Sequence, residues 1–198
     1  MSDFPTLTLV RHGETEWSPS DRHTGRRDIP LTDHGREQAR LSGSRLADHA
    51  PALVLSSPLQ RAAETAELAG FGDRMTIDPD LTEWDYGDYE GRTSAEIFDE
   101  RPEWQLFRDG CPNGESPQQV AERSERVIQR VRASNGDAIL FAHRNLCRVL
   151  AARWLGLPAD HGRFLIMHAA AVCVLGYDHG LEEPAVLHWN LPPDRGNG

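Results

Sequence analysis

Short apolar runs alternate with longer amphipathic stretches along this chain of 198 residues. Apolar runs rich in β-branched side chains and bounded by turn residues are typical of buried strands. Such runs predict six strands, at residues 7–10, 53–56, 75–77, 138–142, 171–177 and 185–188.

The amphipathic stretches between most of these strands carry signals for the start of a helix. Thr32 is placed to cap a helix that runs to about residue 48. Ser57-Pro58 opens a second helix, because proline suits the first helical position. Ser116 begins a capping box ahead of a long helix to about residue 133. A fourth helix is predicted at residues 146–155, before a glycine and a proline.

Strands that alternate with helices predict an α/β fold with three layers, in which a mainly parallel sheet lies between helices on both faces. The last two strands have only a short link, which predicts one antiparallel pair. The length suits a single domain. We expect that domain at residues 1–189, with residues 84–115 as a charged, aromatic excursion over the sheet edge and residues 190–198 as a loose tail.

Charge and cysteine content narrow the classes of partner and compartment. A net charge of −10 makes nucleic acid and anionic membranes poor partners. The longest uncharged apolar stretch, at residues 169–176, is far short of the roughly 20 residues that span a bilayer. Three cysteines without a CxxC pair, together with a start that lacks a secretory signal, predict a cytoplasmic protein.

Polar side chains gather where four predicted strands lead into the next segment. Arg11 and His12 close the first strand, and Arg61 lies in the first helical turn after the second. Glu83 follows the third strand, and His143 follows residues 138–142. In an α/β sheet, ligands bind in the crevice outside the carboxyl ends of the strands. We therefore expect these five side chains to form an anion site with a built-in nucleophile or base.

Missing motifs limit the chemistry of that crevice. The chain has no GxxxxGK[ST] loop, no GxGxxG after a strand and no HExxH helix, so nucleotide, dinucleotide and metal sites are not expected. Two arginines fit phosphate oxygens bidentately, and each cation about 4 Å away contributes roughly 4 kcal/mol near a protein surface. The pattern predicts phosphoryl chemistry without a metal ion or other cofactor.

Five sequence blocks in order resemble the histidine phosphatase superfamily, which has the phosphoglycerate mutase-like fold. RHG alone is a weak signal, whereas the ordered set is specific and covers about three quarters of the chain. The blocks are RHGET at 11–15, LTDHGREQA at 31–39, SSPLQRAAETA at 56–66, LTEWDYGDYEG at 81–91, and a strand-terminal histidine at 143 near Arg148.

The resemblance implies a role for each site residue. His12 would be the nucleophile that becomes a phosphohistidine, and Arg11, Arg61 and His143 would bind the phosphoryl oxygens. Glu83 would protonate the leaving alcohol and then take a proton from water. The resemblance also places Thr24 and Gly25 in a loop that contributes to the phosphate pocket.

Two departures from the family pattern affect the pocket. Ser18 stands where the family often has asparagine, so a hydroxyl is kept and an amide donor is lost. Arg144 stands where the family usually has glycine. An arginine at this position would either add a phosphate contact or crowd the pocket where glycine leaves room, and the sequence leaves both readings open. Trp17 and Trp84 are likewise either packing residues or walls of an apolar pocket for the leaving group.

A third departure separates hydrolysis from mutase activity. The lysine that follows the YGxxxG block in mutases is absent, since Gly91 is followed by Arg92, and the stretch before Gly114 is short. Both features favour water as the acceptor, so a phosphatase is the leading hypothesis. The alternatives are a phosphoglycerate mutase, or a phospholigand-binding protein with little turnover. The expected partner is a small phosphorylated substrate, and an exposed edge strand would also allow a homodimer.

Overall fold

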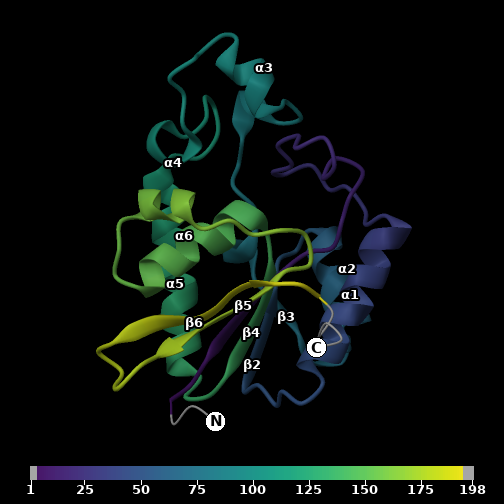
Figure 1. Ribbon diagram of the computed structural model, residues 1–198, viewed down its shortest axis with the longest axis vertical. Coiled ribbons are helices and arrows are strands. Elements are labelled where there is room, and N and C mark those ends of the chain that lie inside the picture. The colour runs from purple at the N-terminus through teal and green to yellow at the C-terminus, as the bar shows by residue number, and fades with distance from the viewer. Residues whose placement is uncertain (1–3, 194–198) are drawn as a thin grey trace.

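One mixed sheet forms the centre of the computed structural model, which describes residues 4–193 (Figure 1). The strand order is β3-β2-β4-β1-β5-β6. The strands are β1 (Leu7–Arg11), β2 (Leu53–Ser56), β3 (Thr76–Ile77), β4 (Ala138–Ala142), β5 (Val172–Tyr177) and β6 (Pro184–Leu191). The first four run parallel, and β5 is antiparallel to β6, as the short link predicted. Strand β5 is also antiparallel to β1, a pairing that the sequence did not indicate.

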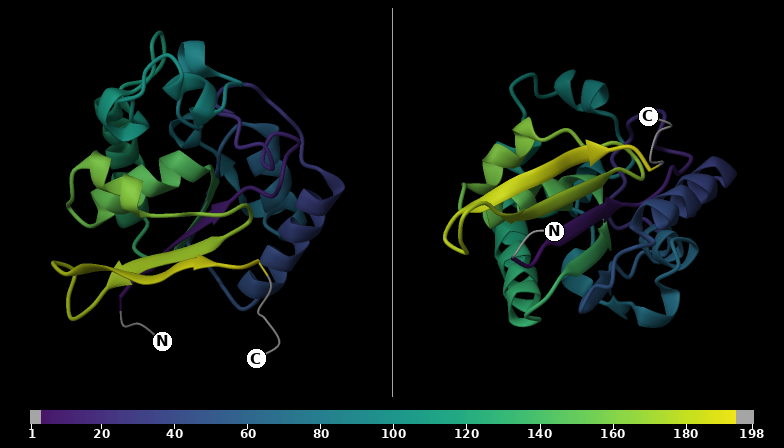
Figure 2. Two further views of the ribbon diagram at one scale, coloured as in Figure 1. Left: turned by 45° about the horizontal axis from the view of Figure 1, so that its top comes forward. Right: turned by 60° about the horizontal axis from the view of Figure 1, so that its bottom comes forward.

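Helices cover both faces of this sheet (Figure 2). The pair α1 (Asp33–Leu46) and α2 (Gln60–Leu68) lies on one face, and α5 (Pro117–Ala133) with α6 (Arg144–Trp154) lies on the other. The shorter elements are α3 (Ser94–Phe98), α4 (Leu106–Asp109) and the 3-10 turns η1 (Gly72–Arg74), η2 (Pro79–Leu81), η3 (Gly87–Tyr89) and η4 (Ala159–Phe164). No helix within residues 4–193 is long and apolar enough to cross a membrane.

Side-chain alternation along the central strands builds two separate apolar clusters. Leu9 and Leu140 belong to the cluster that contains the buried residues of α5 and α6. Val10 and Phe141, one position further along each strand, belong to the cluster with Leu46 of α1. Because successive strand residues point to opposite faces, one sheet supports both helical layers.

Helix starts differ from the predicted ones at two places. Thr32 caps α1 by accepting a hydrogen bond from Gly35 N, as expected. Pro58, however, lies outside α2, which begins at Gln60. The α6 helix begins at Arg144, directly after His143, two residues earlier than predicted. Ser57 and His143, which lie near these two helix starts, hydrogen-bond each other.

The C-terminal segment also corrects the sequence-based prediction. Strand β6 continues to Leu191, so positions 190 and 191 belong to the sheet instead of a loose tail. The Asn190 side chain accepts a hydrogen bond from His168 N, which ties this end of β6 to the segment before β5. Residues 194–198 lie outside the described part.

Residues 84–115 pass over the carboxyl ends of β1 and β4 and carry α3 and α4, at the top of Figure 1. Most of their aromatic residues turn inward, since Trp84 is fully buried and Trp104 is 5% exposed, whereas Phe98 is 44% exposed. Trp84 Nε1 donates to Glu115 O and Trp104 Nε1 to Gly110 O. This segment is a packed cap, and we refer to residues 84–115 as the cap segment.

Two glycines allow the loop after β1 to pass against the start of α1. A Cβ on Gly13 would lie 2.2 Å from the carbonyl oxygen of Gly35, and a Cβ on Gly35 would lie 2.1 Å from that of Glu14. No side chain fits at such distances without backbone movement. The contact fixes the residue that follows His12.

We expect Gly35→Ala to lower the free energy of unfolding by about 2 kcal/mol or more, because the added methyl group overlaps a backbone oxygen. Urea unfolding of wild type and variant measures this. Gly180→Ala is the matched control, since a Cβ at that position meets nothing within 4 Å. Equal stability of the two variants would contradict the proposed contact.

Candidate active site

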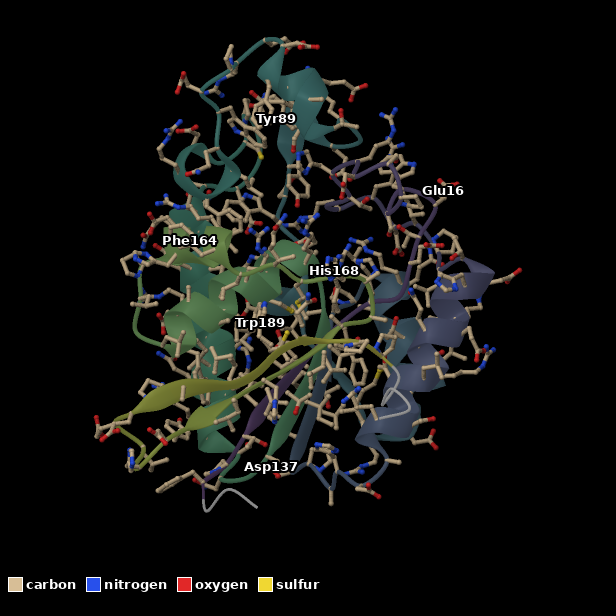
Figure 3. All side chains as sticks on the ribbon, in the orientation of Figure 1. Glu16, Tyr89, Asp137, Phe164, His168 and Trp189 are labelled. Atoms are coloured by element: carbon tan, nitrogen blue, oxygen red, sulfur yellow. The ribbon has the colours of Figure 1, made fainter. Side chains whose placement is uncertain are left out.

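A cavity of about 860 Å³ opens between the sheet and the cap segment. Figure 3 labels Tyr89 in the cap segment on one side of this region and Asp137, just before β4, at the opposite end of the sheet. Arg11, His12 and Glu83 line the cavity. Arg61 and His143 are fully buried just behind them. The sheet thus brings together the five side chains predicted from the strand ends.

Strand pairing places the two histidines side by side. Arg11 of β1 pairs with Ala142 of the adjacent parallel strand β4, and each histidine is the next residue. His12 N donates to Ala142 O at 3.0 Å, and the two imidazole centroids lie 5.2 Å apart.

The His12 ring is fixed in one tautomer and kept neutral. Its Nδ1 lies 2.7 Å from Gly13 O, which as a carbonyl only accepts, so Nδ1 carries the proton and Nε2 keeps its lone pair. Burial, and then the positive charges of Arg61 and Arg11, lower the pKa of His12 well below its usual value. A neutral imidazole with a free Nε2 is a competent nucleophile.

The His143 ring presents a donor to the same site. Its Nε2 lies 2.7 Å from Ser57 Oγ. Leu59 N donates to that Oγ, so the hydroxyl hydrogen is free to donate to Nε2. Burial, and then the charge of Arg61, lower the pKa of His143 well below its usual value, so the ring is neutral. With the Ser57 hydroxyl donating to Nε2, the ring proton is on Nδ1. That Nδ1 is buried and has no protein partner.

The Arg61 guanidinium is held by backbone carbonyl groups. Its Nη atoms donate to the carbonyl oxygens of Thr24, Gly25 and Arg27, at 3.2, 2.9 and 2.9 Å. Thr24 and Gly25 therefore position Arg61, and their contact with a substrate stays a prediction. Gly25 is required there, because a Cβ would lie 2.5 Å from Trp84 O.

Among residues 4–193, the Arg11 guanidinium has one hydrogen-bond partner, Met167 O at 2.8 Å. Burial, and then the charge of Arg144, lower the pKa of Arg11 to about 10, while Glu83 opposes this shift. The side chain is therefore charged at neutral pH.

Four buried side-chain nitrogen atoms around the cavity have no hydrogen-bond partner. Within residues 4–193 they make up the whole set of such buried side-chain atoms: Arg11 Nε, Arg61 Nε, His143 Nδ1 and Arg144 Nε. Buried donors normally have partners, and an unpaired one costs about 1–3 kcal/mol. Unpaired donors at the end of β1, on α2 and at the start of α6 make this region suitable for an anion with several oxygen atoms.

The Glu83 carboxylate lies at the N-terminus of α6. It accepts hydrogen bonds from Trp84 N, Asn145 N and Leu146 N, at 2.8 to 3.0 Å. Free N–H groups at a helix start hold a carboxylate firmly in place. The side chain is 4% exposed and lines the cavity, which suits a group that exchanges protons with a bound substrate.

Arg123 of α5 holds the segment that carries Glu83. Its Nη1 donates to the carbonyl oxygens of Asp80 and Thr82, and its guanidinium makes a buried ion pair with Glu115 at 2.8 Å. Glu115 in turn accepts from Asp85 N. The two ends of the Glu83 loop are thereby tied to one side chain.

Of the other residues predicted for the pocket, some line the cavity and one does not. Ser18 and Arg144 line the cavity, although Ser18 Oγ already accepts from Thr15 N within its own turn. Trp17 lines the cavity, whereas Trp84 is a core residue away from its wall.

Sequence reasoning missed part of the site. Ser57 was treated as a helix start, although its hydroxyl fixes the His143 tautomer. Tyr86 and His23 form a stacked pair 4.6 Å apart on the cavity wall, and Asn145 donates to the Tyr86 hydroxyl. The block YGDYEG contains the tyrosine without marking it as a site residue, and no local signal paired it with His23.

Within the described residues, the one group with ligand atoms close enough to share a metal ion is Asp178, His179 and Glu183. It is exposed in the turn between β5 and β6. Because β5 is antiparallel to β1, this turn lies at the opposite end of the sheet from His12.

Comparison with known proteins agrees with this geometry. The chain belongs to the histidine phosphatase superfamily (branch 1), whose pattern matches residues 7–192. It is 38% identical over 188 residues to an acid phosphatase of Mycobacterium tuberculosis, covering 91% of each chain. It is 38% identical over 186 residues to the sedoheptulose 1,7-bisphosphatase of Saccharomyces cerevisiae, covering 77% of this chain and 68% of the relative.

A solved structure of an open reading frame from M. tuberculosis superposes with a TM-score of 0.89 at 36% identity, covering 96% of this chain and 98% of the other. The six-stranded fold with its flanking helices is thus that of the histidine phosphatases. The phosphatase relatives support a hydrolase that acts on phosphate esters.

We expect Arg123→Met to lower the free energy of unfolding by about 3 kcal/mol or more, because it leaves the buried Glu115 carboxylate without its ion-pair partner. Arg126→Met is the matched control on the same helix. Arg126 pairs with Asp80, but its side chain is 54% exposed, so the loss should stay within about 1 kcal/mol. Chemical denaturation measures both, and similar losses would contradict the structural role of Arg123.

Stability should fall in acid partly through His23. Burial, and then the charge of Arg144, lower the pKa of His23 to about 4 from its usual 6.5. Between these pH values the unfolded chain binds a proton that the folded chain does not, so lowering the pH favours unfolding.

From pH 7 to pH 5 we expect wild type to lose about 2 kcal/mol more unfolding free energy than His23→Gln. Urea unfolding at the two pH values measures the difference. His49→Gln changes an exposed histidine and should behave as wild type. An equal loss in the His23 variant would show that this ring does not titrate as described.

Proposed function

We propose that this protein is a metal-independent phosphomonoester phosphatase that works through a phosphohistidine on His12. The observation that carries the proposal is the set of unpartnered buried donors on Arg11, Arg61 and His143 beside a neutral histidine with a free Nε2. Such donors stabilise the charge that develops on phosphoryl oxygens in the transition state. The proposed substrate is a small phosphorylated molecule.

In the first step, His12 Nε2 attacks phosphorus while the bond from phosphorus to the ester oxygen breaks. Arg11, Arg61 and His143 donate hydrogen bonds to the other phosphoryl oxygens. Glu83 gives its proton to the departing alkoxide, so the alcohol leaves neutral. The His12 Nδ1–H bond to Gly13 O supports the positive charge that forms on the ring.

In the second step, Glu83 takes a proton from water as the water oxygen attacks the phosphohistidine. The bond between Nε2 and phosphorus breaks, inorganic phosphate is released and His12 returns to its neutral form. Glu83 has regained the proton that it lost, so the cycle closes without an external acid or metal ion.

We expect His12→Ala to lower the rate of p-nitrophenyl phosphate hydrolysis by a factor of about a thousand or more, because the variant lacks the proposed acceptor of the phosphoryl group. Brief incubation with labelled substrate, followed by acid-lability analysis, should trap an acid-labile phosphoprotein in wild type only. His49→Ala is the control, since that exposed ring lies on the surface after α1. Full activity in His12→Ala would refute the mechanism.

Product analysis distinguishes the two alternatives. Exchange between phosphoglycerate isomers without free phosphate would indicate a mutase. Binding of phosphate or vanadate without turnover of any ester, with activity restored by Arg144→Gly, would indicate a phospholigand-binding protein.

Removal of metal ions should leave hydrolysis unchanged. The proposed neutralisation of phosphoryl charge comes from arginine and histidine donors, so dialysis against EDTA should retain at least about nine tenths of the activity. Added Mg²⁺ or Zn²⁺ serves as the control for re-activation. Loss of activity on dialysis with recovery on metal addition would contradict the proposal.

A further inference from the structure

Arg144 differs from the other arginines at the rim of the active-site cavity. Among residues 4–193, five arginines and three acidic residues line this cavity: Arg11, Arg22, Arg108, Arg144, Arg148, Asp21, Glu83 and Glu103. The lining thus carries a net positive charge in a protein whose overall charge is −10. Arg11 is used by the proposed phosphoryl site, which leaves four arginines to explain.

Three of these four guanidinium groups are already committed to protein acceptors. Arg22 donates to Gly91 O at 2.7 Å and pairs with Glu96. Arg108 makes a two-pronged contact with Asp109. Arg148 donates to the carbonyl oxygens of Gly162 and Arg163 and to the side chain of Asn145.

The Arg144 guanidinium is bonded much more weakly to the rest of the protein. Its one hydrogen bond within the described chain is a 3.3 Å contact from Nη1 to Asp21 Oδ1, and the Asp21 side chain is 82% exposed. Exposed pairs of this kind contribute little and are easily exchanged. The Arg144 Nε is buried and unpartnered. The side chain therefore has donors to offer to another acceptor.

The position of Arg144 links the phosphoryl site to the outer part of the cavity. It is the residue after His143 and opens α6. Its charge lowers the pKa of Arg11 on one side and those of His23 and Arg148 on the other, after burial in each case. An anion placed here would relieve repulsion among three guanidinium groups.

We propose that Arg144 binds a second acidic group of the substrate, which selects phosphate esters that carry another acid a few atoms from the ester. The second group is a carboxylate or a further phosphate, since both match a guanidinium. Asp21 occupies Arg144 when this group is absent and is displaced when it binds. The inference rests on the proposed phosphoryl site and adds the substrate class to it.

Two phosphonates that are not hydrolysed test the proposal by binding alone. The probes are 3-phosphonopropionate and propylphosphonate, which share a three-carbon chain and differ in the terminal carboxylate. Isothermal calorimetry at physiological salt compares them with wild type, Arg144→Gln, Arg144→Lys and Arg22→Gln. The last variant removes a rim charge whose guanidinium is already bonded, so it is the control for a general field effect.

Wild type should bind 3-phosphonopropionate at least tenfold more tightly than propylphosphonate. Arg144→Gln should reduce this ratio to threefold or less, Arg144→Lys should keep part of it, and Arg22→Gln should leave it above fivefold. As a kinetic counterpart, wild type should favour 3-phosphoglycerate over glycerol 3-phosphate in kcat/KM, and Arg144→Gln should remove the preference.

Several outcomes would overturn the inference. A wild-type ratio near one, or a ratio that survives Arg144→Gln, would show that no second acid is recognised there. An equal loss for both probes in Arg144→Gln would place its contact on the phosphoryl group. Failure of wild type to bind either phosphonate would instead refute the phosphoryl site, and with it the proposed function.

Discussion

The active site depends on burying positive charge without neutralising it. Arg61 is fully buried, and its guanidinium is held mainly by backbone carbonyl groups. Carbonyl oxygens satisfy hydrogen bonds but bring no full negative charge, so the positive potential persists inside the protein. That potential has two effects. It attracts an anion, and, second to burial itself, it lowers the pKa of His12 and His143 and so keeps both rings unprotonated.

The sheet topology explains how two strands and one helix start bring most of the site residues together. Because β1 and β4 are adjacent and parallel, the residues that follow them are neighbours at the same edge. Glu83 lies in a loop after β3, and its carboxylate accepts hydrogen bonds from the N-terminus of α6. This helix begins with Arg144, directly after His143. One helix start therefore orients the Glu83 carboxylate next to the second histidine.

Much of this arrangement could be predicted from residue patterns. Apolar runs indicated the strands because burial on both faces leaves a continuous signal, and the polar residues after those strands indicated the site. The contributions of Thr24 and Gly25 could not be predicted in the same way, because they act through backbone carbonyl groups that any residue possesses. The starts of α2 and α6 were misplaced because Ser57 and His143 bond each other across 86 positions, a contact that local signals do not contain. The extension of β6 to Leu191 likewise depends on pairing with β5.

The anchoring of Arg61 has a consequence for sequence variation within this protein. The Arg61 guanidinium donates three hydrogen bonds to the 24–27 loop, and its Nε–H remains unpaired. Only a planar group with five N–H donors can make both sets of contacts. A lysine has three donors on a single nitrogen and could not serve the loop and an anion together. A lysine therefore cannot replace Arg61, although arginine and lysine often replace each other on protein surfaces.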